Sequence, residues 1–450
     1  MIKSINPYNG KLIKEYELHT PKEVSQKLKS ASTSFEQWKL KPISERTKLL
    51  NTVGNQLKQN KNKYAALITN EMGKPIKQSI AEIEKCIWVC NFYAHNAEQF
   101  LADEIIETDA QESFISYDPI GCVLAIMPWN FPFWQVIRFA APTVTAGNTI
   151  ILKHAANVTG CALAIQELFE LAGYPQGCFQ SILVNHEQIE TIIENDTIKA
   201  VTLTGSDAAG RKVAATAAKN LKKTVLELGG NNACIVWDDA DLDKYINIMV
   251  NARMQNAGQS CIAAKRFIVM DKVYDAFLEK YTNSVTSLKS GNPENMDTDI
   301  ATLARKDLAE KVKEQVEKTL QKGAKVHVGN SRDGAYYEPT IITDVKAGMP
   351  LFDEEVFGPV AAIIKVKTRE ESLKVASDSK FGLGTMLFTE DIDAARRSIG
   401  KISDGAFFIN ELVKSDPRLP FGGTKNSGYG RELSKEGILE FVNKKTVYIK

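Results

Sequence analysis

The sequence predicts an α/β protein of more than one domain, built around a largely parallel sheet. Strand-like and helix-like segments alternate along most of the 450 residues, which is the pattern that parallel strands with crossover helices produce. The length exceeds that of a typical single domain, so we expect two or three domains. Hydrophobic residues make up 44% of the chain and charged residues 25%, values that permit a large buried core.

Charge and hydropathy narrow the classes of partner. The 56 Lys and Arg residues nearly balance the 55 Asp and Glu residues, and the formal net charge is +1. This balance gives no reason to expect a nucleic acid or an anionic membrane as partner. We expect neither a signal peptide nor a membrane span, because no apolar run is long enough. The seven cysteines form no metal-like CxxC pairs, so we expect no metal site and a cytoplasmic protein with reduced thiols.

The first hundred residues are predicted to be mainly helical. A helix is expected to start within 21–28, and apolar residues at helical spacing predict helices over 44–60, 61–71 and 81–100. Cys86 and Cys90 are four residues apart, without further Cys or His nearby, and this fits one face of the last of these helices.

The middle of the chain has the alternation of a Rossmann-like nucleotide-binding sheet. Short buried strands are predicted at 121–127, 148–152, 200–204 and 224–228, with helices at 162–172 and 208–220. A doubly wound sheet of this kind binds its ligands at the carboxyl ends of the strands. A second α/β block begins near residue 231, with strands at 266–270, 325–328 and 360–365. We therefore place the main domain border just after Gly230.

A cysteine with small neighbours, Cys261 in NAGQSC (256–261), is the first candidate for chemistry. A Gly and a Ser beside a Cys leave backbone N–H groups free to face the thiol and any oxyanion formed there. Such surroundings can lower the pKa of the thiol and make it a nucleophile. Taken alone, the motif fits a buried structural cysteine equally well.

A carboxylate at the end of a predicted strand is the second candidate. Glu227 stands in ELGGN (227–231), where two glycines permit a tight turn and close backbone approach. A carboxyl group at a semi-buried strand end can have a raised pKa and act as a general base. An ion pair at a domain border is the alternative role.

Two further motifs directly follow predicted strands. In PWNFP (128–132) two prolines fix the loop, and Asn130 offers the amide N–H donor that an oxyanion hole needs. Capping a turn is the alternative role of this Asn. In TGSDAAG (204–210), Gly205 and Ser206 open a helix whose N-terminal N–H groups can hold a phosphate. A Gly-Ser helix cap is common by itself, so this motif depends on the others for its meaning.

Taken together and in order, the motifs resemble the aldehyde dehydrogenase superfamily. PWNFP, a lysine after a strand, TGS, ELGGN, GQSC, EEVFGPV and PFGG follow one another between about Asn6 and Lys450. Within the superfamily, MPWNFPFWQVIR and the short N-terminus most resemble bacterial succinate-semialdehyde dehydrogenases. The resemblance implies NAD(P)+-dependent oxidation of an aldehyde, most simply succinate semialdehyde, to its acid through a cysteine thioester. The alternatives are a broad-specificity or aminoaldehyde dehydrogenase, a CoA-acylating dehydrogenase, and a non-catalytic structural protein on the same scaffold.

The resemblance also implies roles for individual residues. The catalytic set is Cys261 as nucleophile, Glu227 as general base and Asn130 as oxyanion donor. The residues implied to bind the cofactor are Trp129, Lys153, His154, Ala156, Gly205, Ser206, Leu228, Glu355 and Phe357. The residues implied to bind the substrate are Arg138, Ser415 and Arg418. Arg138 is suited to a bidentate grip on a distal carboxylate, with an ordinary salt bridge as the alternative, and Gln255 stands where some relatives have a second arginine.

One departure from the family pattern bears on the choice between NAD and NADP. Many members have K-P-S-E where this chain has Lys153-His154-Ala155-Ala156, and that Glu normally accepts hydrogen bonds from the adenosine ribose. Ala156 removes this acceptor and its negative charge, so a 2′-phosphate is no longer repelled. Lys153 supplies positive charge nearby, and His154 is expected to add to it. We therefore expect NADP+ to be accepted, alongside NAD+.

The resemblance finally implies a division of the chain and an assembly. The NAD(P)-binding domain is expected over 1–111 and 131–230, the catalytic domain over 231–412, and oligomerisation segments over 112–130 and 432–450. Residues 112–118 and 446–449 have the period-two alternation of strands for a protruding β-hairpin. The expected assembly is a homodimer or homotetramer.

Overall fold

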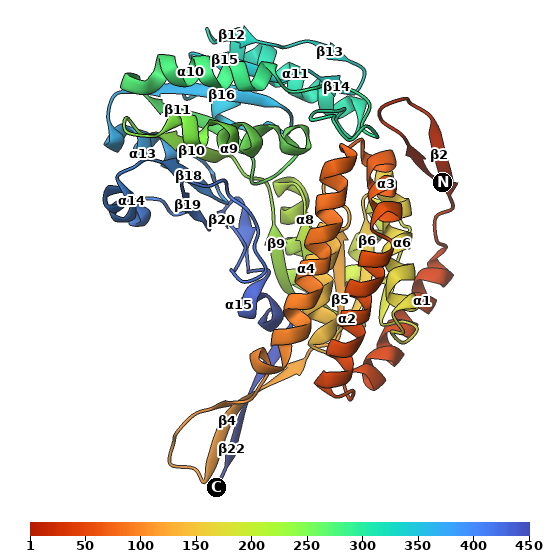
Figure 1. Ribbon diagram of the computed structural model, residues 1–450. Helices are drawn as coiled ribbons and strands as arrows, with labels where there is room; N and C mark the ends of the chain where they lie inside the picture. The colour runs from red at the N-terminus through yellow and green to blue at the C-terminus, as the bar shows by residue number, and fades with distance from the viewer.

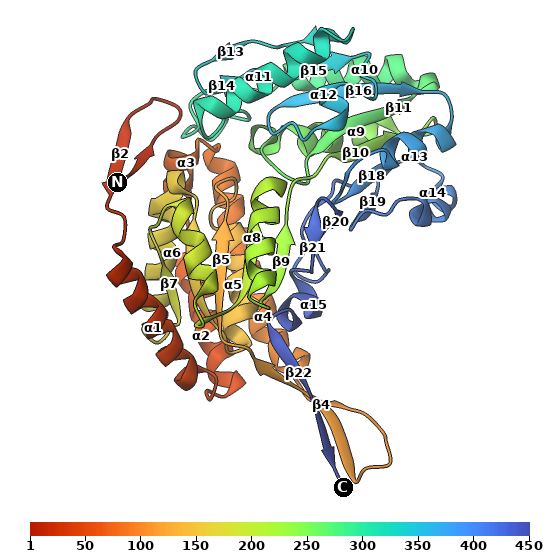
Figure 2. The same ribbon diagram turned by 180° about the vertical axis from the view of Figure 1, so that it is seen from behind.

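Two twisted sheets organise the molecule, and a β arm projects from one end (Figures 1 and 2). The computed structural model describes residues 1–450. The six-stranded sheet has the order β21 (Gly428–Tyr429), β9 (Lys223–Glu227), β8 (Ile198–Thr204), β5 (Cys122–Met127), β6 (Thr149–His154), β7 (Phe179–Ser181). Its strands are parallel except β21, which runs antiparallel to β9. The predicted α/β class is confirmed.

The second sheet has seven strands and lies in the later part of the chain. Its order is β12 (Lys325–Val328), β15 (Thr340–Thr343), β16 (Val360–Val366), β11 (Ala264–Met270), β10 (Asn232–Val236), β18 (Thr385–Phe388), β19 (Phe407–Ile409). Only the pair at the β12 edge is antiparallel. The chain passes from the first sheet to the second between Glu227 and Asn232.

Helices cover both sheets, as buried parallel strands require. Around the first sheet lie α1 (Pro21–Trp38), α2 (Ile43–Gln59), α3 (Lys61–Met72), α4 (Ile76–Phe100), α5 (Trp134–Thr145), α6 (Thr159–Leu171), α7 (Ile189–Glu194), α8 (Asp207–Lys219) and α15 (Ser434–Leu439). Around the second lie α9 (Leu242–Met254), α10 (Asp271–Thr286), α11 (Lys306–Leu320), α12 (Pro350–Asp353), α13 (Arg369–Ser377) and α14 (Ile392–Ser398). Short 3₁₀ turns are η1 (Ala156–Val158), η2 (His186–Gln188), η3 (Gln255–Gly258) and η4 (Ile399–Lys401).

The early helices begin at N-terminal capping signals in the sequence, and α4 begins earlier than predicted. Thr20 accepts from the backbone of Glu23 and Glu23 bonds back to Thr20, so a capping box begins α1. Helix α1 therefore starts where the sequence predicted, and buried residues at helical spacing carry it to Trp38. Helix α4 begins directly after Pro75, five residues earlier than predicted, because Pro suits the entry to a helix. No helix combines the length and apolarity needed to cross a membrane.

The protruding arm pairs two segments from distant parts of the chain. Strand β4 (Glu112–Pro119) runs antiparallel to β22 (Val442–Ile449) over its whole length, and β3 (Glu104–Ile105) adds a short third strand. The C-terminus lies at the tip of the arm (Figure 2). The arm contains fewer residues than the segments 112–130 and 432–450 expected from the sequence. Strand β5 belongs to the six-stranded sheet and α15 packs on α4, so both boundaries need correction.

Small hairpins complete the fold. The pairs are β1 (Ile2–Ile5) with β2 (Leu12–Tyr16), β13 (Arg332–Asp333) with β14 (Tyr336–Tyr337), and β17 (Phe381–Gly382) with β20 (Thr424–Lys425). The first hairpin was not predicted, because its second strand is largely exposed and polar and lacks a clear alternation of apolar residues.

Candidate active site

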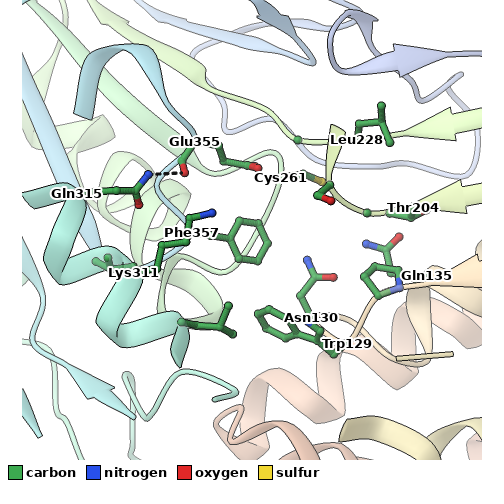
Figure 3. A pocket seen from close by; sticks show the side chains of 16 residues that line it. Trp129, Asn130, Gln135, Thr204, Leu228, Cys261, Lys311, Gln315, Glu355 and Phe357 are labelled. Carbon is green, nitrogen blue, oxygen red and sulfur yellow. Dashed lines mark hydrogen bonds between the residues drawn. The ribbon is translucent and has the colours of Figure 1, made fainter. Parts of the chain in front are cut away.

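Two cavities meet at Cys261. The first, of about 220 Å³, lies between the carboxyl ends of β8 and β9 and helix α11; the second, of about 250 Å³, lies between α4, α5 and residues 412–415. Cys261 and Gln135 line both cavities. Figure 3 shows the first cavity, with Cys261 and Asn130 directed into it. A group held at Cys261 is therefore accessible from two sides.

The loop that carries Cys261 has an unusual backbone. Asn256, Ala257 and Gly258 have φ angles of 54°, 50° and 73° in succession. The left-handed region is unfavourable for residues with a side chain, and such strain persists only where surrounding contacts impose it. The Asn256 side-chain amide donates to the carbonyl of Asn130 at 2.8 Å, which ties the loop to the PWNFP segment. A Cβ on Gly258 would lie 2.3 Å from a backbone oxygen of residue 358, so only glycine fits there.

Burial raises the pKa of the Cys261 thiol to about 11, against the opposing effect of the Lys265 and Arg138 charges. The lowered pKa expected from the sequence is therefore wrong for this conformation. Lys265 lies below the loop and donates to the carbonyl oxygens of Ser260 and Cys261, both at 2.6 Å. At this pKa the thiol is largely protonated at neutral pH, so formation of a thiolate requires an acceptor for its proton.

The pH dependence of alkylation is expected to report this pKa. The thiolate alone reacts with iodoacetamide, so the rate at Cys261 should rise about tenfold per pH unit until the pH approaches 11. The other six cysteines are at most 2% exposed and should stay unmodified in the folded protein. Peptide mass mapping after timed alkylation measures both. An alkylation rate at Cys261 that levels off below pH 8 would contradict the raised pKa of this thiol.

Glu227 is the last residue of β9, and its carboxyl group is buried beside the cavities. The residue is 2% exposed and neither carboxylate oxygen has a hydrogen-bond partner. Burial raises its pKa well above the usual range, and the neighbouring carboxylate of Glu432 raises it further. This direction agrees with the expectation for a general base. The side chain itself lines neither cavity, whereas the next residue, Leu228, lines the first, and the Glu227 charge still raises the pKa of Cys261.

Asn130 lies on the wall of the first cavity, 4% exposed. Its amide nitrogen donates one hydrogen to the carbonyl of Gln259 at 3.1 Å, which leaves the second hydrogen for a ligand. The loop is anchored by Glu82 on α4, which accepts from the backbone N–H groups of Phe133 and Trp134 at 2.8 and 3.0 Å. Glu82 is itself paired with the buried Lys74. This anchor was not predicted, because α4 is far from the PWNFP motif along the chain.

The first cavity has the features of a dinucleotide site. Gly205 and Ser206 line it at the start of α8, where the Ser206 side chain caps the helix. Backbone N–H groups at a helix N-terminus attract phosphate. The hydroxyl of Thr204 and the side-chain carbonyl of Gln135 are buried there without a partner, so they are available to a polar ligand. Leu228, between Gly210 and the cavity, completes this wall.

Aromatic and acidic residues form the opposite wall. The Trp129 and Phe357 rings lie edge to face, 5.7 Å between centroids. Glu355 accepts from the backbone N–H of Gly230 at 2.9 Å and lies 3.5 Å from Lys265, which fixes its position. Lys311 on α11 also lines this cavity (Figure 3), and no sequence motif identified it.

The residues expected at the adenosine end lie outside the cavity lining. Lys153 is 6% exposed, and burial lowers its pKa. His154 donates from Nε2 to the carbonyl of Pro132 at 2.9 Å and accepts at Nδ1 from Ala155 N–H. Burial lowers the His154 pKa to about 4, so this residue is neutral and adds no positive charge, contrary to expectation. Ala156 is exposed at the start of η1.

The second cavity is lined by several charged side chains. Arg138 lines it, only 2% exposed, with its guanidinium 2.5 Å from the carboxylate of Glu432. Ser415 lines it as expected. Arg418 does not: its side chain is 68% exposed and paired with Asp416 at 2.6 Å. Lys85 on α4 lines the cavity instead, and no sequence motif identified it. No group of His, Cys, Asp or Glu is arranged to hold a metal ion.

Comparison with known proteins places the whole chain in one family. The model of the aldehyde dehydrogenase family matches residues 1–447. This protein belongs to that family. The aldehyde dehydrogenase is 48% identical to a probable NADP(+) succinate-semialdehyde dehydrogenase of Synechocystis sp., over all of this chain and 99% of that one. It is 43% identical to succinate-semialdehyde dehydrogenase (NADP(+)) 1 of Mycobacterium tuberculosis, with the same coverage.

A solved structure confirms the predicted fold. Succinic semialdehyde dehydrogenase from Streptococcus pyogenes, in complex with NADP+ as the cofactor, superposes with a TM-score of 0.98. The two chains are 37% identical, and the match covers all of both. The resemblance inferred from the seven motifs is therefore confirmed across the chain.

Proposed function

We propose that this aldehyde dehydrogenase oxidises succinate semialdehyde to succinate with NADP+. The observation that supports this most directly is the position of the Cys261 thiol. It borders a cavity with a helix N-terminus and aromatic walls on one side, and a cavity containing Lys85 and Arg138 on the other. A dinucleotide suits the first cavity, and a small aldehyde with a distal carboxylate suits the second. Relatives named for this activity match the full chain.

The side chains present fit the cofactor. Gly205 and Ser206 would hold the pyrophosphate at the start of α8, and Glu355 and Phe357 the nicotinamide riboside. The unpaired Thr204 hydroxyl in this wall supports a polar occupant. Lys153 and Ala156 would face the adenosine ribose, where the absence of a carboxylate favours a 2′-phosphate. When bound, the cofactor would provide a nicotinamide ring that accepts hydride.

The chain's own residues then divide the chemistry among them. Cys261 releases its proton to solvent through the cavities that it lines and attacks the carbonyl carbon, while the free amide N–H of Asn130 and the backbone N–H of Cys261 donate to the oxyanion. Once the aldehyde carbon is oxidised, the acyl group remains on sulfur as a thioester. Glu227 takes a proton from water, the resulting hydroxide attacks the thioester, and the acid leaves with the Cys261 sulfur restored. The raised pKa of Glu227 makes its carboxylate a stronger acceptor for this proton than an ordinary Glu.

A kinetic panel with both cofactors tests the proposal. Wild-type protein should have a higher kcat/KM for succinate semialdehyde than for butanal, and should use NADP+ at least as well as NAD+. A preference for NAD+ by several hundredfold would reject the cofactor assignment, since Ala156 and Lys153 offer no reason for it.

The same panel separates the alternatives. Equal kcat/KM for charged and uncharged aldehydes would indicate a broad-specificity enzyme. A preference for aminoaldehydes would indicate a substrate site that favours a positively charged group rather than a carboxylate. Acid release without CoA would exclude the acylating class. Absence of any NAD(P)H formation would leave only a structural role.

We further propose a cytoplasmic homodimer or homotetramer assembled through the β4–β22 arm. The arm carries unpaired outer strand edges, which pair readily with another chain, and exposes Ile105, Tyr448 and Ile449. All seven cysteines are free, as is usual in a reducing compartment. Light scattering of the full chain and of a chain ending at residue 441 measures the role of the arm.

A further inference from the structure

Lys85 differs from every other charged side chain of the second cavity, because no carboxylate lies within ion-pair distance of it. The others are already paired: Glu82 with Lys74, Arg138 with Glu432, and Lys414 with Glu411. Pairing neutralises a charge and reduces what it can offer a ligand. Arg138, the residue that the sequence favoured for carboxylate binding, therefore already has a carboxylate partner. Lys85 is the cavity's cation without one.

The position of Lys85 suits an anion in the cavity. Its ammonium donates to the Ser415 hydroxyl at 2.7 Å and lies 4.4 Å from the centre of the Trp134 ring. These contacts hold the side chain in place and leave two of its three hydrogens without an acceptor. Ser415 accepts from Lys85 and keeps its own hydrogen, which is free to donate to the same ligand. Lys85, Ser415 and Cys261 all line this cavity.

An unpaired ammonium in this setting is electrostatically costly. Burial, followed by the positive charge of Arg138, lowers the pKa of Lys85 to about 8. Cys86, Asp416 and Glu82 act in the opposite direction but do not offset this. A carboxylate arriving beside Lys85 would relieve the cost of the buried charge.

We propose that Lys85, assisted by the Ser415 hydroxyl, binds the distal carboxylate of the substrate and so sets the preference for carboxylated aldehydes. The inference rests on the proposed function, because it assumes oxidation of an anionic aldehyde at Cys261. Arg138 lines the same cavity, where it adds positive potential and raises the cost of an uncompensated Lys85 charge. The aldehyde end reaches Cys261 while the carboxylate end stays at Lys85 and Ser415.

The pH dependence follows from the titration of this ammonium. Below pH 8 Lys85 is charged and binds the carboxylate; above pH 8 the free enzyme loses the charge. KM for succinate semialdehyde should therefore rise as the pH increases from 7 to 9.5, whereas KM for butanal should not follow it. A Lys85→Arg variant keeps its charge over this range and should show a flatter profile.

The experiment compares Lys85→Gln and Lys85→Arg with Lys63→Gln, which removes an exposed charge on α3 outside both cavities. The kcat/KM values for succinate semialdehyde, glutarate semialdehyde and butanal are measured with saturating NADP+ at pH 7 and 9.5. Lys85→Gln should reduce the selectivity for the carboxylated aldehydes over butanal by roughly ten- to a hundredfold, mainly through KM, as expected for loss of a hydrogen bond to a charged group. Lys85→Arg should restore most of the selectivity, and Lys63→Gln should behave as wild type.

The outcomes separate this inference from the proposed substrate. If wild type prefers glutarate semialdehyde and Lys85→Gln loses that preference, the substrate assignment fails and the role of Lys85 stands. If wild type prefers succinate semialdehyde and Lys85→Gln keeps that selectivity, the role of Lys85 is overturned. A wild type without preference for either anionic aldehyde overturns both. If Lys85→Gln does not fold, an unchanged pH profile of KM in Lys85→Arg overturns the inference by itself.

Discussion

Replacement of Cys261 with Ala is expected to lower kcat by about a thousandfold or more, because no other group can form the acyl intermediate. None of the remaining six cysteines lines either cavity, so none can substitute for it. The loss should be the same for every aldehyde, since the thiol attacks the carbonyl group common to all of them. Steady-state formation of NADPH at 340 nm measures the effect.

Two controls show that the lost activity is chemical in origin. The Cys261→Ala protein should still quench or shift NADPH fluorescence on binding, because the first cavity keeps its other lining residues. Its thermal unfolding midpoint should stay close to that of wild type, since the thiol makes no hydrogen bond that holds the fold. Full dehydrogenase activity in the Ala variant would remove Cys261 from the mechanism altogether.

Replacement of Glu227 with Gln is expected to stop the reaction after the first half. The amide keeps the shape of the side chain but accepts no proton, so thioester hydrolysis should slow by a factor on the order of 10² to 10⁴. Attack by Cys261 and oxidation of the aldehyde should still occur once. Rapid mixing should therefore show a burst of about one NADPH per active site, followed by a very slow phase.

Mass spectrometry of the quenched Glu227→Gln reaction should find the acyl group on Cys261. Glu436→Gln is the matched control, because Glu436 is exposed on α15 and should leave both phases unchanged. Loss of the burst together with the slow phase would instead assign Glu227 to activation of the thiol. Because the raised pKa of Cys261 means that the thiol needs a proton acceptor, this experiment distinguishes activation of water from activation of the thiol.

The parallel sheet was predictable because its strands are buried on both faces. Strands β5, β6, β8 and β9 appear as short apolar runs, three of them ended by Gly or Pro, and the structure shifts their predicted limits by at most two residues. Features that depend on pairing between distant segments were harder to predict from the sequence. The β1–β2 hairpin is polar and was missed, and the limits of the arm became visible only with the register of Val442 opposite Pro119.

The site residues likewise fall into those that local sequence predicts and those that depend on contacts between distant segments. Gly205, Ser206 and Asn130 stand in short motifs whose local chemistry is legible, and all three line the first cavity. Lys85 and Glu432 come to the site from segments with no motif, through the packing of α4 and of the C-terminal region. Predictions that depended on burial also failed: the sequence does not show that a pocket dehydrates the Cys261 thiol, or that His154 turns its ring towards backbone carbonyls.

The antiparallel pairing of β9 with β21 has a consequence for the order in which a newly made chain matures. Glu227 faces Gly428 across this ladder, and β4 finds its partner only in the last nine residues. During translation, more than half of the polypeptide must therefore leave the ribosome with these edges open, a state in which strands pair with other chains. Emergence of the C-terminal region closes the sheet edge beside Glu227 and completes the arm at almost the same time. A nascent chain that stalls after residue 410 would thus carry its reactive cysteine on an unfinished and aggregation-prone frame.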